Sequence, residues 1–458
     1  MLRCGPGHRE SAAGHSDRHY TTAWQQGIAV AQSPERRGCR ERWFDCAASA
    51  GMVSLQIHSF RQRDVRVTSR HFDIAIIGSG IAGGALAAAL KGSGLSVLLL
   101  DRRFGPLDTA RGDHIQPAMQ PVLSRWGVLD RLLQAGAERR AGTRWFDAEG
   151  AHIVTVPVPQ RDDCAGAFLF LNHEKIGDIL LDIAGEAGAV NITGLSDWSL
   201  TRAAGSWRVD WQANDQSASA TCTVLVAADG TASTVRSRLK IGLDRHRYQY
   251  PIAVLYGREQ GVSDERTLNV YLTEERMVSL IPRTGGATKV GFPVSPEDIG
   301  FWKTGSEDAL QRRLDEWCPG VSFDSLAFGA IYPPVSQQSE LYRGEGALVL
   351  IGDARHAMHP ARSMGMNTCF RVADQLADSL KCVSSGFSEA QVLPLLSEFE
   401  AYFEQELTPR LSENHAAGLQ MDTITGGGFV ALKKQLQLAA GDERVLGGMA
   451  LKAAGLTV

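Results

Sequence analysis

A glycine-rich turn between an apolar strand and a helix is the feature that most limits how this chain can fold. Residues 73–78 form an apolar run of strand length, residues 81–93 have the pattern of a helix, and residues 96–100 form a second apolar strand that ends at Asp101. A strand, a helix and a strand in this order predict a parallel sheet with a right-handed crossover. The turn itself reads Gly78-Ser79-Gly80-Ile81-Ala82-Gly83.

Each glycine of this turn has a physical role in binding a dinucleotide. Gly78 permits the tight turn, Gly80 lets a pyrophosphate approach the backbone, and Gly83 allows the helix to pack closely on the sheet. The N-terminus of the helix offers free N–H groups and a partial positive charge to the phosphates. Asp101 lies 23 residues after Gly78, where an acid accepts hydrogen bonds from a ribose. An acid at this position favours NAD or FAD over NADP.

Two further motifs follow apolar strands later in the chain. The first contains Asp229-Gly230 and continues to Ser233 and Arg236; the second contains Gly352-Asp353, His356, His359-Pro360 and Gly365-Met366-Asn367. An Asp after a strand often does no more than cap the next helix. Beside a nucleotide-binding fold, contact of both acids with a ligand is the favoured interpretation.

The three motifs, in this order and spacing, resemble those of the flavin-dependent aromatic monooxygenases of the para-hydroxybenzoate hydroxylase superfamily. The resemblance covers about residues 72–380, and the His359-Pro360 pair is similar to that of hydroxylases of ubiquinone biosynthesis. It implies an α/β fold in which a Rossmann-like FAD-binding domain of the glutathione-reductase type carries an inserted, mainly antiparallel β-sheet substrate domain, with helices at the C-terminus.

On this basis we expect four regions. The FAD-binding domain comprises residues 70–140, 166–190, 222–245 and 340–385, the substrate domain comprises 141–165, 191–221 and 246–339, and residues 386–458 are helical. Residues 1–69 are expected to be a disordered or non-native extension, because residues 1–70 hold eleven Arg, no Lys and six acids without a sustained period. A transit peptide, or sequence upstream of a true start at Met52, are the alternatives.

The resemblance also implies which residues hold FAD. The pyrophosphate is expected at Gly78, Gly80, Ile81, Ala82 and Gly83, the adenosine ribose at Asp101 with Arg102 beside it, and the phosphates near Arg111. The remaining expected contacts are Asp229 and Gly230 to FAD and the pyridine nucleotide, Gly352 and Asp353 to the ribityl chain, Gly365, Met366 and Asn367 at the pyrimidine end, and Pro360 on the flavin face where oxygen reacts. The helix that starts at Gly365 would stabilise the negative charge of reduced flavin.

The activity implied is that of a single-component, FAD-dependent monooxygenase. NADH or NADPH would reduce the flavin transiently, O₂ would form a C4a-hydroperoxide, and an electron-rich aromatic or quinone-like small molecule would be hydroxylated or epoxidised. A flavin-dependent reductase, a halogenase-like enzyme and a flavin-binding protein without turnover are the alternatives. Residues 102–140 contain no lysine, which halogenases need there. The chain reads Arg362-Ser363-Met364-Gly365 where the family has Gly-Gln-Gly, and His173 where it often has arginine.

Two residues are candidates for contact with the substrate. His114 falls by resemblance near the ring system, where a histidine with a pKa near neutrality could deprotonate a phenol; a plain polar lining is the alternative. Arg283 could pair with an anionic group, or could be a surface arginine at a turn. His356 and His359 are three residues apart without a third ligand at metal spacing, so no metal is expected, and we interpret both as loop residues with backbone partners.

Composition excludes several other classes of protein. The 47 basic and 51 acidic residues give a net charge of −4, which argues against a nucleic-acid partner. The sequence has no run of about 18 apolar residues, so no integral membrane segment is expected. Eight scattered cysteines without a C-x-x-C pattern are typical of reduced thiols, and hence of a cytoplasmic protein.

Overall fold

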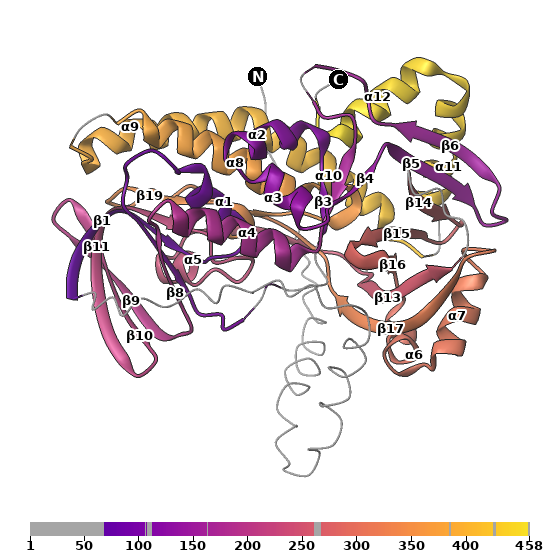
Figure 1. Ribbon diagram of the computed structural model, residues 1–458, viewed down its shortest axis with the longest axis horizontal. Coiled ribbons are helices and arrows are strands. Elements are labelled where there is room, and N and C mark those ends of the chain that lie inside the picture. The colour runs from indigo at the N-terminus through magenta and orange to yellow at the C-terminus, as the bar shows by residue number, and fades with distance from the viewer. Residues whose placement is uncertain are drawn as a thin grey trace, which may run out of the picture. The chain divides into compact units, whose positions relative to one another are not determined.

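The computed structural model describes residues 68–105, 107, 112–162, 164–260, 267–383, 386–424 and 427–456 (Figure 1). Contacts divide the chain into residues Met1–Val65 and Arg66–Val458, and all that follows concerns the second unit. Of the region 1–69 that was expected to be disordered or non-native, residues 1–67 lie outside the described residues, as does Arg111, whereas residues 68 and 69 begin the strand Thr68–Ile77.

The first sheet contains the predicted strand–helix–strand unit. Strands β8 (Val190–Thr193), β2 (Val97–Asp101), β1 (Thr68–Ile77) and β11 (Gln216–Ala227) pair in this order and in parallel, and β19 (Leu348–Leu350) runs parallel to the C-terminal end of β11. Helix α1 (Ile81–Ala89) connects β1 to β2. The strand–helix–strand order and the parallel pairing of β1 with β2 are confirmed, and α1 ends four residues earlier than expected.

Both faces of this sheet are buried, as the alternation of side chains along a strand requires. Ile74 and Ile76 of β1 pack under α1, α4 (His173–Glu186) and α8 (Met364–Lys381), whereas Ala75 and Ile77 point to the opposite core. Buried aromatic side chains, among them Trp198, Trp207 and Trp211, fill that opposite core.

Those tryptophans belong to an antiparallel extension that the prediction assigned to the wrong sheet. Strands β9 (Leu195–Ala203) and β10 (Ser206–Ala213) pair with each other, and β10 pairs with the N-terminal half of β11. Residues 191–221 therefore lie in the sheet of β1 and not in the second sheet. Figure 1 shows this meander next to β1 and β11.

The second sheet is mainly antiparallel, as the resemblance implied. Its seven strands follow the order β17 (Ser322–Tyr332), β13 (Ile252–Gln260), β16 (Ala287–Pro293), β15 (Met277–Arg283), β14 (Thr267–Leu272), β5 (Gly142–Asp147) and β6 (His152–Pro157). Helices α6 (Ile299–Thr304) and α7 (Glu307–Asp315) bury Trp302, Leu310 and Leu314 against this sheet. Helices α11 (Gly427–Gly441) and α12 (Glu443–Ala454) bury Phe429, Leu436 and Ala450 against β6 and β14.

Two three-stranded sheets carry residues of the candidate site. One contains β3 (His114–Ile115), β7 (Phe168–Phe170) and β4 (Glu138–Arg140), and the other contains β12 (Leu243–Arg247), β18 (Val335–Ser339) and β20 (His356–Ala357). The short helices α2 (Gln120–Arg125), α3 (Leu129–Gln134) and α5 (Thr234–Arg238) complete this part of the chain.

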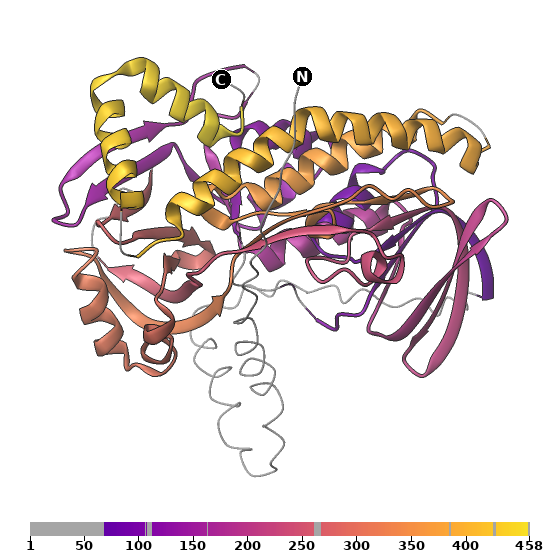
Figure 2. The same ribbon diagram turned by 180° about the vertical axis from the view of Figure 1, so that it is seen from behind.

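The C-terminal region is helical, as predicted. Helix α9 (Glu389–Tyr402) continues through a π-helical turn, η8 (Phe403–Leu407), into α10 (Thr408–Met421), and these three form one long orange to yellow run when seen from behind (Figure 2). None of the helices in the described ranges is long and apolar enough to cross a membrane.

Candidate active site

The three glycine-containing motifs meet at the carboxyl ends of the parallel strands. Gly78 follows β1 with a φ of +107°, and a Cβ atom there would overlap the carbonyl oxygen of Ala228, just after β11. A Cβ atom on Gly83 would overlap the carbonyl oxygen of Gly78, and one on Gly352 would lie 2.5 Å from Cβ of Ala82. A side chain is therefore excluded at these three positions by the backbone of Ala228, by the turn's own backbone at Gly78 and by the side chain of Ala82, respectively.

A second group of glycines faces open space. A Cβ atom added at Gly80, Gly230 or Gly365 would meet no atom of the other described residues within 4 Å, apart from the adjoining backbone. Gly80 is also the N-cap of α1, and as a glycine it has no side chain that could cap that end of the helix. An uncapped helix N-terminus with bare backbone beside it fits a phosphate group, so this edge fits a dinucleotide cofactor.

Asp101 shapes the first turn. Its carboxylate accepts hydrogen bonds from the backbone N–H and hydroxyl of Ser79, at 2.8 and 3.0 Å, and from the N–H of Arg103 at 2.8 Å. Arg103 pairs with Asp101 at 3.5 Å and donates to the carbonyl of Ser79, whereas Arg102 is exposed. Sequence reasoning selected Arg102 and did not identify Arg103, the arginine that turns inward and joins the Asp101 turn; the contact of Arg102 with FAD stays a prediction.

Asp229 serves as a cap within the fold. Its carboxylate accepts hydrogen bonds from the backbone N–H groups of Thr234 and Val235 at the start of α5, at 2.6 and 3.1 Å, and from the hydroxyl of Ser233 at 2.5 Å. The motif is linked to the third one by Arg236, which donates to the carbonyls of Thr231 and Ala354, both at 2.8 Å. The capping alternative raised for this acid is therefore observed.

Asp353 has a different environment. It lies half-buried in the 3₁₀ turn Gly352–Ala354, and one carboxylate oxygen accepts from the hydroxyl of Thr231 at 3.2 Å. The side chain of Gln337, which sequence reasoning did not select, donates to the carbonyl of Asp353 at 2.7 Å and fixes the backbone there. No helix of the described chain uses the Asp353 carboxylate as an N-cap, so this acid differs from Asp229.

Helix α8 begins where the third motif predicts a helix start. Ser363 precedes it in the left-handed region (φ 51°), and Met366 and Asn367 are buried in its first turn. The Asn367 side chain accepts from the N–H of Gln116 at 2.8 Å and donates to the carbonyl of His114 at 3.0 Å. The helix start is thereby joined to β3. Pro360 opens the preceding turn, Pro360–Arg362, and is exposed.

His114 lies between two aromatic rings. It stacks on Phe170 with ring centroids 4.8 Å apart and meets Phe168 edge-on at 4.7 Å. Its Nε2 atom is buried with no hydrogen-bond partner among the described residues. Burial lowers the pKa of His114 to about 4, so the expectation of a pKa near neutrality is wrong, and the ring is neutral at pH 7.

Arg283 is buried and internally paired. Its guanidinium donates to Glu174 at 3.0 Å and to Asn172 at 3.1 Å, and lies 3.5 Å from the carboxylate of Asp113. The alternative of a surface arginine is therefore wrong, and these contacts give no support to an anion-binding role. Its neighbour in this network, Lys289, pairs with Asp113 at 2.8 Å. Burial lowers the pKa of Lys289, and Asp113 opposes that shift.

The two histidines of the third motif have different surroundings. His359 accepts from the N–H of Ala361 at 3.1 Å, whereas neither ring nitrogen of the buried His356 has a partner in the described part of the chain. The expected backbone partner therefore exists for His359 and not for His356.

Within the described ranges no group of three or more side chains could hold a metal ion.

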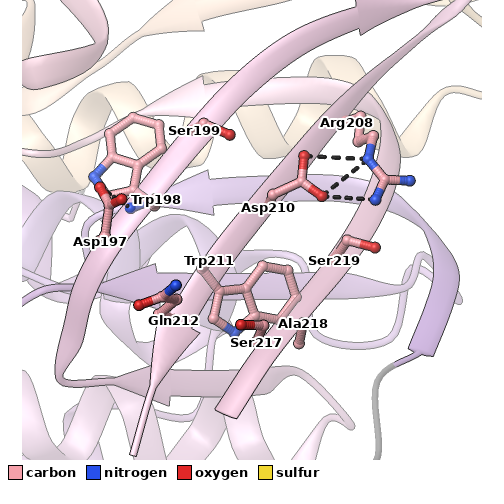
Figure 3. A pocket seen from close by; sticks show the side chains of 10 residues that line it. All are labelled: Asp197, Trp198, Ser199, Arg208, Asp210, Trp211, Gln212, Ser217, Ala218 and Ser219. Atoms are coloured by element: carbon pink, nitrogen blue, oxygen red, sulfur yellow. Dashed lines mark hydrogen bonds and ion pairs between the residues drawn. The ribbon is translucent and has the colours of Figure 1, made fainter. Parts of the chain in front are cut away.

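A separate hollow of about 450 Å³ lies on the antiparallel extension of the first sheet (Figure 3). Strands β9, β10 and β11 line it with the residues Asp197, Trp198, Ser199, Arg208, Asp210, Trp211, Gln212, Ser217, Ala218 and Ser219. It contains no residue of the three motifs. The candidate active site is therefore the carboxyl edge of the parallel strands and not this hollow.

A parallel sheet with a glycine-rich first turn, an open helix N-terminus and a second antiparallel sheet is typical of a dinucleotide-binding protein. The comparison with known families agrees, because a family model described as "FAD binding domain" matches residues 71–400. The chain belongs to this family, within the superfamily of FAD-dependent aromatic hydroxylases.

Named relatives are similar over most of the chain. The ubiquinone hydroxylase UbiM of Neisseria meningitidis is 25% identical over 387 residues, which cover 82% of each chain. The 3-amino-4-hydroxybenzoate 2-monooxygenase of Streptomyces cremeus is 26% identical and covers 66% of this chain and 76% of its own. The solved structure of the p-nitrophenol 4-monooxygenase PnpA of Pseudomonas putida matches with a TM-score of 0.67 at 18% identity, over 84% of this chain and 98% of its own.

Proposed function

We propose that this chain is a single-component monooxygenase that uses FAD, NADH or NADPH, and O₂ to hydroxylate or epoxidise an electron-rich aromatic or quinone-like small molecule. The observation that carries the proposal is the meeting of all three motifs at one edge, where the backbone at Gly80, Gly230 and Gly365 is open. Relatives named as hydroxylases and monooxygenases support the reaction class.

The FAD-holding residues proposed are those of the three motifs. The backbone from Gly78 to Gly83 would bind the pyrophosphate, Asp101 and Arg103 would fix the adenosine end, Asp353 would bind the ribityl chain, and the start of α8 at Gly365, Met366 and Asn367 would hold the ring. Asp229 would act indirectly, since its carboxylate caps α5. The turn at Pro360 would form the side on which oxygen reacts.

Bound FAD supplies two-electron redox chemistry and activation of O₂. In the overall balance one oxygen atom enters the substrate, the other leaves as water, and NADH or NADPH provides the two electrons. The protein's part is to orient the substrate and to keep water out. Neutral His114, stacked on Phe170, is suited to line this space as an acceptor of a phenolic hydrogen bond. With its lowered pKa it would be a weak base.

The decisive experiment measures flavin content and coupled oxidation together. Purified protein should be yellow and release FAD on denaturation, and a panel of phenols, quinolones and quinols should include one that stimulates NAD(P)H oxidation without peroxide release. A colourless protein that cannot take up FAD but binds NAD would contradict the flavoenzyme assignment.

A flavin-binding protein without turnover is the second candidate. It is favoured by the segment Arg362–Gly365, where Arg362 is exposed and pairs with Glu413 at 3.4 Å, in place of the family's Gly-Gln-Gly. Stoichiometric FAD without NAD(P)H oxidation in the presence of any panel compound would support it.

A further inference from the structure

The long helical run α9–η8–α10 contacts the segment between Asp353 and Arg362 at several successive points. Glu400 and Glu404 pair with Arg355, and the ring of Phe403 lies 5.3 Å from that of His356. Further along, Asn414 donates from its side chain to the carbonyl of His359 at 3.1 Å. This helical run therefore contacts the stretch that joins Asp353 to Pro360 at Arg355, His356 and His359.

Arg355 is the charged centre of this support. Its side chain is 1% exposed, and its guanidinium donates to the carbonyl of Ser339 and to Glu404 at 2.9 Å, lies 3.5 Å from Glu400, and sits 4.6 Å above the ring of Phe403. In the family pattern G-D-A-x-H this position is the variable one. A buried arginine there, with two carboxylates on the facing helix, is a feature of this chain that the resemblance does not account for.

The two carboxylates that pair with Arg355, those of Glu400 and Glu404, differ in their exposure to solvent. Burial raises the pKa of Glu400 to about 7, with Glu404 adding to the rise, and Arg355 and Arg343 opposing it. Glu404 is about half-exposed. The π-helical turn η8 begins at Phe403, so that Phe403, Glu404 and Leu407 all come from this irregular turn. Such turns are found often at functional sites, because they redirect side chains within a helix.

We propose that Arg355, held by Glu400 and Glu404, is a positioning residue that fixes the backbone from Asp353 to Pro360 in the geometry that binds the flavin end of FAD. This inference rests on the proposed function. Arg355 is not itself a cofactor contact in this account. It acts through the backbone of its own segment, which Ser339 also holds by donating from its N–H to the carbonyl of Arg355 at 2.8 Å.

The test compares Glu404→Gln and Arg355→Gln with Arg355→Lys and with wild-type protein. The first readout is the dissociation constant of FAD for apoprotein, followed by flavin fluorescence. We expect both glutamine variants to weaken FAD binding by roughly threefold to thirtyfold, and Arg355→Lys to recover part of the loss. Glu398→Gln is the matched control, because Glu398 is exposed on α9 and undergoes the same change of charge.

The second readout is hydrogen exchange of the apoprotein, which requires no cofactor. Peptides covering residues 353–363 should exchange faster in Glu404→Gln and Arg355→Gln than in wild type, and unchanged in Glu398→Gln. If Arg355→Gln does not fold, the test depends on Glu404→Gln alone. The Glu404 side chain is about half-exposed, and its replacement leaves Glu400 to pair with Arg355.

The dependence of FAD affinity on pH tests whether the charge of Glu400 takes part in holding Arg355. As the pH rises through about 7, Glu400 becomes charged and pairs more strongly with Arg355, so FAD affinity should rise, and Glu400→Gln should abolish this rise. The inference would be overturned if Glu404→Gln and Arg355→Gln both bound FAD with wild-type affinity and showed wild-type hydrogen exchange in residues 353–363. Failure of the wild-type protein to bind FAD would instead overturn the proposed function, while the exchange data would still decide the role of Arg355.

Discussion

Asp229 and Asp353 each follow an apolar strand, yet their carboxylates have different partners. Asp229 accepts from two backbone N–H groups at the start of α5, whereas Asp353 accepts from the Thr231 hydroxyl and caps no helix of the described chain. Asp353 is half-buried where the second and third motifs meet, beside Thr231, and this position makes it the better candidate for a ligand contact. The two acids therefore allow a direct comparison of stability and binding.

We predict opposite effects of alanine at these two positions. Asp229→Ala should lower the free energy of unfolding by about 1–2 kcal/mol, because the N–H groups of Thr234 and Val235 lose their acceptor while Ser233 remains the N-cap of α5. Asp353→Ala should act mainly on FAD binding, which should weaken roughly tenfold to hundredfold, the loss expected for a hydrogen-bonded carboxylate. Denaturant unfolding and FAD titration of both variants test this. Equal, negligible effects on FAD binding would count against the proposed role of Asp353.

A second prediction concerns the buried histidines. Burial lowers the pKa of His114, His356 and His359 to about 4 from the ordinary value of 6.5. Between these pH values the folded state binds fewer protons than the unfolded state, so stability should fall as the pH falls from 6.5 toward 4.

His356→Leu should remove part of that fall. The free energy of unfolding of the variant minus that of wild type should be up to about 2 kcal/mol larger at pH 5 than at pH 7.5. Unfolding by urea at both pH values measures this difference, and the same substitution at exposed His152 is the control. An identical pH dependence in wild type and His356→Leu would show that His356 is not the group responsible.

At the scale of elements, the start of α8 is where stability and binding should diverge. Gly365 lies in the first turn of the helix outside the left-handed region, and a Cβ atom there would meet no protein atom within 4 Å. Glycine in a helix costs roughly 0.5–1 kcal/mol relative to alanine. A glycine that the protein alone does not require is explained if FAD approaches the backbone at this point.

We therefore predict that Gly365→Ala raises the melting temperature of the apoprotein and weakens FAD binding, and that Gly365→Val weakens FAD binding further and releases reducing equivalents as peroxide. Gly447→Ala in α12 is the control, because its Cβ would also meet open space, on an exposed stretch of helix. Coupled oxygen transfer by Gly365→Val at the wild-type rate would show that α8 is remote from the flavin.

The elements also show what sequence reasoning could and could not reach. The strand–helix–strand unit and the helix start at Met364 follow from local pattern, because apolar runs and glycine positions are local signals. The sheet to which β9 and β10 belong does not, since an alternating antiparallel strand looks the same in either sheet. The pairing of Lys289 with Asp113, and of Arg355 with Glu404, joins residues far apart in sequence, and no local pattern marks such partners.

At the scale of the whole molecule, the described hydrophobic core is built from residues beginning at Phe72. Its two largest clusters cover the two faces of the first sheet, and two others join the second sheet to α6, α7, α11 and α12. This core supplies the support that the candidate site needs.

The Arg-rich, Lys-free composition of the N-terminal segment predicts that deletion of residues 1–65 leaves soluble expression, melting temperature and FAD content unchanged. Side-by-side purification of the full and shortened chains, with calorimetry and flavin absorbance, measures all three. Insoluble shortened protein would show that the first unit takes part in folding.

The central claim is that three distant motifs form one FAD site, and an equilibrium titration of the apoprotein tests it most directly. Flavin fluorescence should show one FAD bound per chain, and NAD⁺ in excess should fail to fill the site. Saturable binding of NAD⁺ with no binding of FAD would contradict the account.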